Sequence, residues 1–203
     1  LGGVPTSGDA ELSFNGEAWR VDQFFGGSQG RYPLTNNDTD ALLRNTSANQ
    51  RRAQVWQPNG TGQLDGVTVE LRAVGTLTTG SVWVELRTAS GGLPTSTILA
   101  ISKLRAASSV AASNTPYQFD FPFPYSLVSG RDYAYVLSGN FPINASNHLA
   151  VRFDTTGSYA QGDMATFDGA TWTTNAGDDI GFITLSWHTL DTFYGFGNQD
   201  SDQ

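Results

Sequence analysis

The chain has no cysteine among its 203 residues, and it is poor in lysine, histidine and methionine. The absence of cysteine excludes disulfides, thiolate metal sites and cysteine nucleophiles. Lys103 is the only lysine among 11 basic residues, against 19 acidic ones, so the net charge is −8. An acidic surface repels phosphate, and no dense basic cluster is present, so we expect no binding of nucleic acid.

Long apolar runs are also missing. None reaches the roughly 18 residues of a membrane helix, so we expect no membrane span. No segment shows a clean helical stripe. The segment 99–112 is rich in small residues and admits at most one short helix.

What the chain does have is glycine, aromatic side chains and alternation. It contains 23 Gly and 12% aromatic residues, with only 15% charged residues. Apolar and polar residues alternate within 67–72, 82–87, 117–123 and 149–153, and such a period of two is typical of half-buried strands. Further strands are expected at 53–57, 98–104, 133–137, 164–167 and 180–187. Turn signals such as Asn59-Gly60 and Gly91-Gly92 separate these runs.

Many short strands with turns between them predict an all-β fold, an antiparallel β-sandwich of the jelly-roll type. We expect a core built from one face of each strand, with Phe119, Phe121 and Phe123 in alternation on one of them. The other face should lie in water or against a partner, which places Trp83 and Glu85 outside.

The two ends differ from the middle in composition. Residues 1–50 are rich in Gly, Asn, Ser and Thr and lack sustained periodicity, so they are predicted to form an N-terminal arm or extended segment. An ordinary long loop with one strand near 18–25 is the other interpretation. Residues 51–188 form the predicted sandwich, and residues 189–203 form a C-terminal tail. Both end segments are expected to make contacts with other molecules.

The stretch from Leu64 to Gly139 carries a recognisable order of motifs: a hairpin, the turn Gly91-Gly92-Leu93-Pro94, and the strand entry that leads into Tyr133. It resembles a loose group of bacterial and phage jelly-roll domains, which includes the choice-of-anchor domains of surface proteins and similar folds in virion appendages. The likeness extends to about Phe182. It implies the fold and an external location, and it supplies no catalytic residue. A sorting signal or anchoring span is absent, which favours a particle component over a wall-anchored protein.

The chemistry of the sequence points to no reaction, so the protein is not expected to be an enzyme. His148 and His188 are not in a metal-ligand spacing, and no Gly-x-Ser-x-Gly occurs. Most turn aspartates serve the backbone. A calcium site is the alternative for those of the last third, although no Asp-x-Asp-x-Asp-Gly loop supports it. These aspartates are Asp154, Asp163, Asp168, Asp178 and Asp179.

Aromatic side chains are the remaining candidates for ligand or interface contacts, because exposed rings suit sugar stacking and protein interfaces. The candidates are Trp83, Trp172, Tyr159, Phe193, Tyr194 and Phe196. The other interpretation is that each ring covers an edge of its own sandwich.

The first functional hypothesis is a structural protein on the surface of a bacteriophage virion (decoration, neck or tail appendage) that contacts copies of itself and other virion proteins as a homo-oligomer. The second is a carbohydrate-binding module of a secreted or cell-surface protein, acting on glycans.

Overall fold

The computed structural model describes residues 31–157 and 159–185. This part of the chain is almost entirely β-structure. Its helical turns are three short 3-10 segments at Leu34–Asn36, Ser47–Asn49 and Ala107–Ser109. Within residues 99–112, the only helical segment is the 3-10 turn at Ala107–Ser109. No helix in the described ranges is long and apolar enough to cross a membrane.

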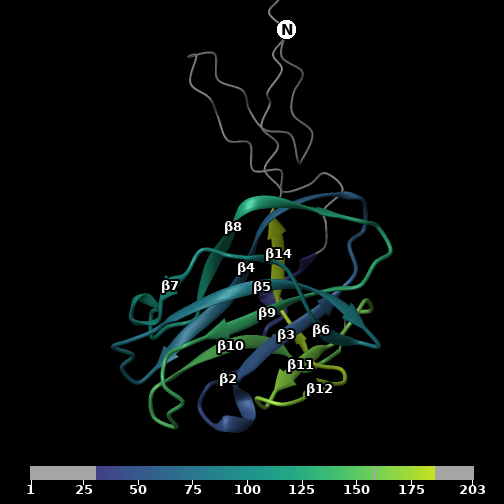
Figure 1. The fold of residues 1–203 in the computed structure, drawn as a ribbon. Coiled ribbons are helices and arrows are strands. Elements are labelled where there is room, and N and C mark those ends of the chain that lie inside the picture. Colours follow the sequence, from purple (N-terminus) through teal and green to yellow (C-terminus); the bar gives the residue numbers. More distant parts are fainter. Residues whose placement is uncertain (1–30, 158, 186–203) are drawn as a thin grey trace, which may run out of the picture.

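The strands form two antiparallel sheets that pack face to face (Figure 1). The first sheet contains β1 (Arg31–Tyr32), β2 (Thr39–Leu43), β4 (Gly62–Val74), β8 (Thr115–Leu127), β10 (His148–Asp154), β13 (Asp179–Ile180) and β14 (Phe182–Leu185). The second contains β3 (Arg51–Trp56), β5 (Ser81–Ser90), β6 (Leu93–Ile101), β7 (Arg105–Ala106), β9 (Tyr133–Gly139), β11 (Met164–Phe167) and β12 (Trp172–Asn175). The chain crosses repeatedly between the sheets, and the predicted sandwich is confirmed.

The core lies between the sheets and comes from alternate positions of the strands, as the period-two pattern predicts. Val82, Val84 and Leu86 on β5 are fully buried there. The other core positions expected from the sequence are buried in the same cluster: Val67, Val69, Leu71, Phe119, Phe121, Tyr133, Val151 and Phe153.

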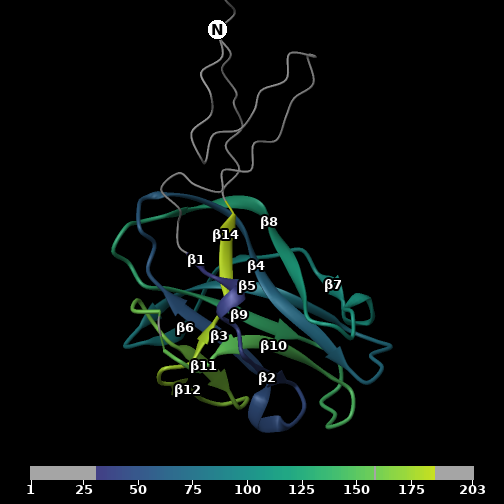
Figure 2. The ribbon, with the colours of Figure 1, turned by 180° about the vertical axis from the view of Figure 1, so that it is seen from behind.

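In the first sheet, β4 and β10 diverge, and β14 lies between them. β10 pairs with β4 at one end, through Val151 and Leu71. Beyond that point β14 pairs with β4, and β13 pairs with the end of β10. In Figures 1 and 2, β14 therefore stands beside β4, with β1 on its other edge. The last strands of the described residues thus complete the first sheet.

Residues 31–50, which the sequence analysis assigned to an N-terminal arm, belong to the sandwich. β2 pairs along its whole length with β10, and Leu43 opposite Leu149 is fully buried. β1 pairs with β14 and buries Tyr32. Sparse apolar residues are enough here because the partner strands supply hydrogen bonds and a core to cover. Residues 1–30 and the tail 189–203 lie outside the described residues.

Phe123 is the clear exception to the predicted alternation. Leu64 of β4 is opposite Tyr125 of β8, while Gly66 is opposite Asp120. Asp65 alone therefore stands across from residues 121–124, which form a large bulge. This bulge reverses the expected direction of Phe123, whose side chain is 82% exposed.

Candidate functional site

The outer face of the second sheet carries both tryptophans that the sequence singled out. Because Val82 and Val84 point into the core, Trp83 and Glu85 point outward on β5. Trp172 on β12 is opposite Phe167 and joins a small apolar cluster on the same face. Trp172 begins the edge strand β12.

A small second core occupies the middle of this outer face. Its members are the buried residues Ala53, Val55, Ala134, Val136 and Ala165, with Leu93 and Trp172 packed against them. Strands β12 and β6 are the two ends of the sheet, and in a flat sheet five strand spacings of about 4.8 Å would separate them. Yet β6 approaches β3, β9 and β12. The β5–β6 hairpin therefore folds across the face and covers it.

An ion pair is buried beneath this hairpin. Glu85, expected in water, is only 4% exposed, and Arg87 lies beside it on the same face. Arg87 Nε donates to Glu85 Oε2 at 2.8 Å, and its Nη1 donates to the carbonyl of Thr95 on β6 at 3.0 Å. Trp83 Nε1 donates to Glu85 Oε1 at 3.0 Å. Burial by itself would raise the pKa of Glu85, but the donors of Arg87 and Trp83 and the Arg87 charge outweigh it, so this pKa is lowered.

The structure therefore gives Trp83 a partner within its own sheet. Its ring is half-buried, and its nitrogen is committed to Glu85. Trp172 is also half-buried and stacks on Phe167, with ring centroids 5.0 Å apart and a tilt of 41°. Arg51 lies over the Phe167 ring at 5.3 Å. Both tryptophans mainly cover their own sandwich, and each leaves part of its ring to solvent.

Tyr159 is not a surface ring. It is half-buried at the edge of the main core, with centroids 5.6 Å from Tyr32 and 5.5 Å from Phe182. Burial raises the pKa of its hydroxyl above the usual range. Among the described residues it shares no cluster with Trp83 or Trp172. The other three aromatic candidates, Phe193, Tyr194 and Phe196, lie outside the described residues.

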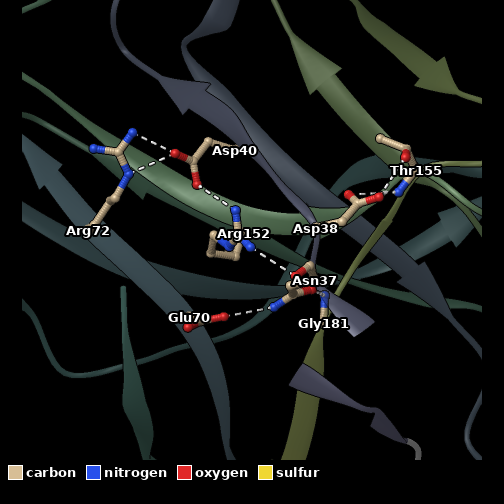
Figure 3. A network of polar contacts seen from close by, with 8 residues as sticks. All are labelled: Asn37, Asp38, Asp40, Glu70, Arg72, Arg152, Thr155 and Gly181. Carbon is tan, nitrogen blue, oxygen red and sulfur yellow. Dashed lines mark hydrogen bonds and ion pairs between the residues drawn. The ribbon is translucent and has the colours of Figure 1, made fainter. Parts of the chain in front are cut away.

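The first sheet carries a polar network (Figure 3). Asp40 of β2 lies between Arg72 and Arg152, with 2.7 Å from Arg72 Nε and 3.5 Å from Arg152 Nη1. Asn37 accepts at its carbonyl from Arg152 Nη2 at 2.9 Å, and its side chain donates to Glu70 at 3.1 Å. The network ties β2 to β4 and β10, so its role is to hold the separated strands together.

The aspartates proposed for calcium are distributed among separate structural roles. Asp168 caps its own turn by accepting from the N–H groups of Ala170 and Thr171. Asp163 accepts from the N–H of Gly177 at 3.1 Å. Asp154 accepts from the hydroxyl of Tyr32. Within residues 31–157 and 159–185, no group of three or more His, Asp or Glu side chains is placed to hold a metal ion.

Asp179 is the most perturbed of these carboxylates. It is fully buried on β13, where it accepts from Gln54 Nε2 at 3.0 Å and from the Tyr159 N–H at 3.1 Å. Burial raises its pKa to about 6, the two hydrogen bonds oppose this, and the charges of Asp163 and Asp154 add to it. Gln54 also accepts from the Ile180 N–H at 2.7 Å, so it bridges the two sheets. Gln54 and Asp179 are fully buried, so this cluster connects the two sheets inside the core and is not accessible to a substrate.

Exposed apolar side chains mark a different region, which the sequence analysis missed. Ile98 and Ile101 lie on β6, Leu104 follows it, and Phe123 lies on the bulge of β8; β6 and β8 are neighbours. We call these four residues the apolar surface. Leu104 is 66% and Phe123 82% exposed. The signal in the sequence was the pair of prolines around Phe123, Pro122 and Pro124, because proline disrupts regular strand pairing and is typical of bulges and edges.

The comparisons with known proteins add no name to this arrangement: no protein-family model matches the chain, and no curated protein is significantly similar to it.

Proposed function

We propose that this chain is a non-enzymatic structural subunit of a bacteriophage virion, a decoration, neck or tail-appendage protein, that works through protein–protein contacts. The observation that supports this proposal most is the apolar surface. Leu104 and Phe123 are mostly exposed and Ile98 and Ile101 nearly half-exposed, and exposed apolar side chains mark interaction sites when they gather on neighbouring strands. The location on a virion rests on the resemblance of the sequence to jelly-roll domains of phage appendages.

Phe123 has the properties of an interface anchor. Aromatic rings are enriched at the energetic centres of protein interfaces. Its neighbours Pro122 and Pro124 have fixed φ angles, so the bulge loses little freedom when it is bound. A ring held out rigidly from the surface gains more from burial in a partner than a flexible one does. We propose a second copy of the chain as that partner, which makes the subunit a homo-oligomer.

The test is the molar mass of the full chain in solution by light scattering after gel filtration. We expect a multiple of the 21.8 kDa chain mass. The variant Phe123→Asp should shift the mass toward the monomer, because a charge cannot be buried in an apolar contact without a partner. Ile143→Asp, at another exposed apolar position, should leave the mass unchanged. A wild-type protein that stays monomeric at high concentration would contradict the proposal.

A carbohydrate-binding module is the second candidate. The observation that favours it is a cavity at the edge of the sandwich, between β7 and β8, which is lined by both polar and apolar residues. Glycan binding by a monomer, without any change of mass for Phe123→Asp, would favour this alternative over the structural subunit.

A further inference from the structure

The cavity at the edge of the sandwich has a volume of about 300 Å³. One wall comes from the segment that leads into β7, with Lys103, Leu104 and Arg105, and the other comes from β8, with Gln118, Phe119 and Asp120. The backbone N–H of Lys103 donates to the carbonyl of Asp120 at 2.8 Å. This hydrogen bond fixes the two walls to each other, so the cavity is formed before any ligand arrives.

Two cations and one carboxylate line this cavity, Lys103 and Arg105 on one wall and Asp120 on the other, so positive charge is in excess there. The chain carries a net charge of −8, and Lys103 is its only lysine. The ion pairs of the described residues use Arg72, Arg87 and Arg152, so neither Lys103 nor Arg105 takes part in one. The Nε of Arg105 is buried and has no hydrogen-bond partner among the described residues. This atom is closed to solvent, whereas the residue as a whole is only half-buried, so a ligand in the cavity would contact the exposed part of the Arg105 side chain.

Aromatic rings hold the guanidinium of Arg105 in place. Its Cζ lies 4.7 Å from the centroid of Tyr117 and 6.0 Å from that of Phe119. Contact with these rings restrains the guanidinium, and its planar fork matches the two oxygens of a carboxylate. Lys103 adds a second positive charge on the same wall.

The opposite wall suits hydroxyl groups instead of a second anion. Gln118 Nε2 donates to Asp120 Oδ1, which leaves the amide oxygen of Gln118 and Asp120 Oδ2 as acceptors. These acceptors can take hydrogen bonds from neutral hydroxyls and would repel another carboxylate. Leu104, 66% exposed, supplies an apolar surface for the C–H face of a ring.

We propose that this cavity binds a carboxylated monosaccharide of the uronic-acid class, as found in acidic polysaccharides. The carboxylate lies between Lys103 and Arg105, and the ring hydroxyls face Gln118 and Asp120. The volume admits one sugar ring with a few waters. The proposal names the ligand class for the carbohydrate-binding candidate. It shares Leu104 with the apolar surface but does not involve Phe123, so variants of Phe123 and of Lys103 test the two proposals separately.

The experiment titrates the full chain with glucuronate, glucose and acetate, followed by the amide shifts of Lys103, Arg105 and Gln118 in NMR spectra. Glucose has the ring without the carboxylate, and acetate has the carboxylate without the ring. We expect glucuronate to bind roughly tenfold more tightly than either, and its affinity to fall as salt is added. Equal affinity for glucose and glucuronate, or for acetate and glucuronate, would overturn the assignment.

Variants separate the cavity from general surface charge. Lys103→Gln, at an exposed side chain, should weaken glucuronate binding roughly fivefold without affecting folding. Arg131→Gln removes the same charge at an exposed position that does not line the cavity, and it should bind as the wild type does. An equal loss in both variants, or none in Lys103→Gln, would contradict the proposal. The molar mass of Lys103→Gln should equal that of the wild type, so this failure is distinct from a failure of the subunit proposal.

Discussion

At the scale of single residues, Glu85 and Arg87 form an ion pair that is buried on the outer face of the second sheet. The alternation along β5 correctly predicts that Glu85 points away from the core, yet this side chain is buried by the β5–β6 hairpin. A carboxylate can be buried there because Arg87 and Trp83 surround it with donors. Arg87 also binds the Thr95 carbonyl, so a single side chain connects the sheet to the hairpin that covers it.

Asp179 makes the stability of the protein depend on pH in an unusual direction. Its pKa of about 6 in the folded chain, raised by burial, lies above its ordinary value of 3.8, so the native state holds this proton more tightly than the unfolded state. The stabilising contribution is therefore complete below about pH 4 and is lost as the pH rises through 6. Relative to Asp179→Asn, we expect the wild type to lose about 2–3 kcal/mol between pH 4 and 7. Urea unfolding of both proteins at each pH measures this.

Asp168 supplies a control of opposite sign. Its pKa is lowered by hydrogen bonds from the backbone of Thr171 and Ala170, so its contribution is present at neutral pH and is lost on acidification. The free energy of unfolding of Asp168→Asn should therefore decrease relative to that of the wild type as the pH rises. Parallel stability curves for the wild type and Asp179→Asn would show that Asp179 ionises like an exposed carboxyl group.

At the scale of elements, β8 departs most from its sequence pattern. Four aromatic residues alternate from Tyr117 to Phe123, which predicts one regular strand with all four in the core. The bulge opposite Asp65 keeps Phe121 inside and turns Phe123 out. Local periodicity cannot reveal a bulge, because its position depends on the register with β4. The prolines were the only local sign of it.

Gly66 of β4 provides a test of the bulge. A Cβ at this position would lie 2.6 Å from the backbone oxygen of Phe119, which cannot move without breaking the strand pairing. We expect Gly66→Ala to lower the free energy of unfolding by about 1–3 kcal/mol. Urea denaturation is the measurement.

The matched variant is Gly60→Ala, where an added Cβ would meet nothing within 4 Å. Its stability should stay within about 0.5 kcal/mol of the wild type. If both glycine variants have the same urea midpoint as the wild type, β4 and β8 do not approach each other closely at Gly66.

At the scale of the whole molecule, the pairing of β2 with β10 shows that the sandwich begins before residue 51. The composition of residues 1–50 favoured an arm that folds only on another molecule, but residues 39–43 complete the first sheet of the same chain. We expect Leu43→Ala to cost about 2–5 kcal/mol, as for other buried leucines. Thermal or urea unfolding of the isolated protein measures the loss.

Leu42→Ala is the appropriate comparison, because Leu42 points to the other face and is half-buried. It should lose less than half as much stability. Equal stability of Leu43→Ala and the wild type would restore the interpretation of this segment as an arm.

The sequence by itself determined the fold class, most of the strands and the inward face of each regular strand. These properties depend on alternation and turn residues, which are local and are written directly in the order of the residues. It also singled out Trp83 and Trp172, which do lie on one face of the second sheet.

Only the tertiary structure decided which residues are available to a partner. Exposure depends on what packs over a residue, and the covering segment lies far away in the chain: β6 covers the outer face of β5 and β9, and β10 receives β2. The cavity of Lys103 and Arg105 likewise exists only because β8 lies beside the segment that leads into β7. Such long-range contacts leave no periodic trace in the sequence, since each strand carries the same pattern whichever strand becomes its neighbour.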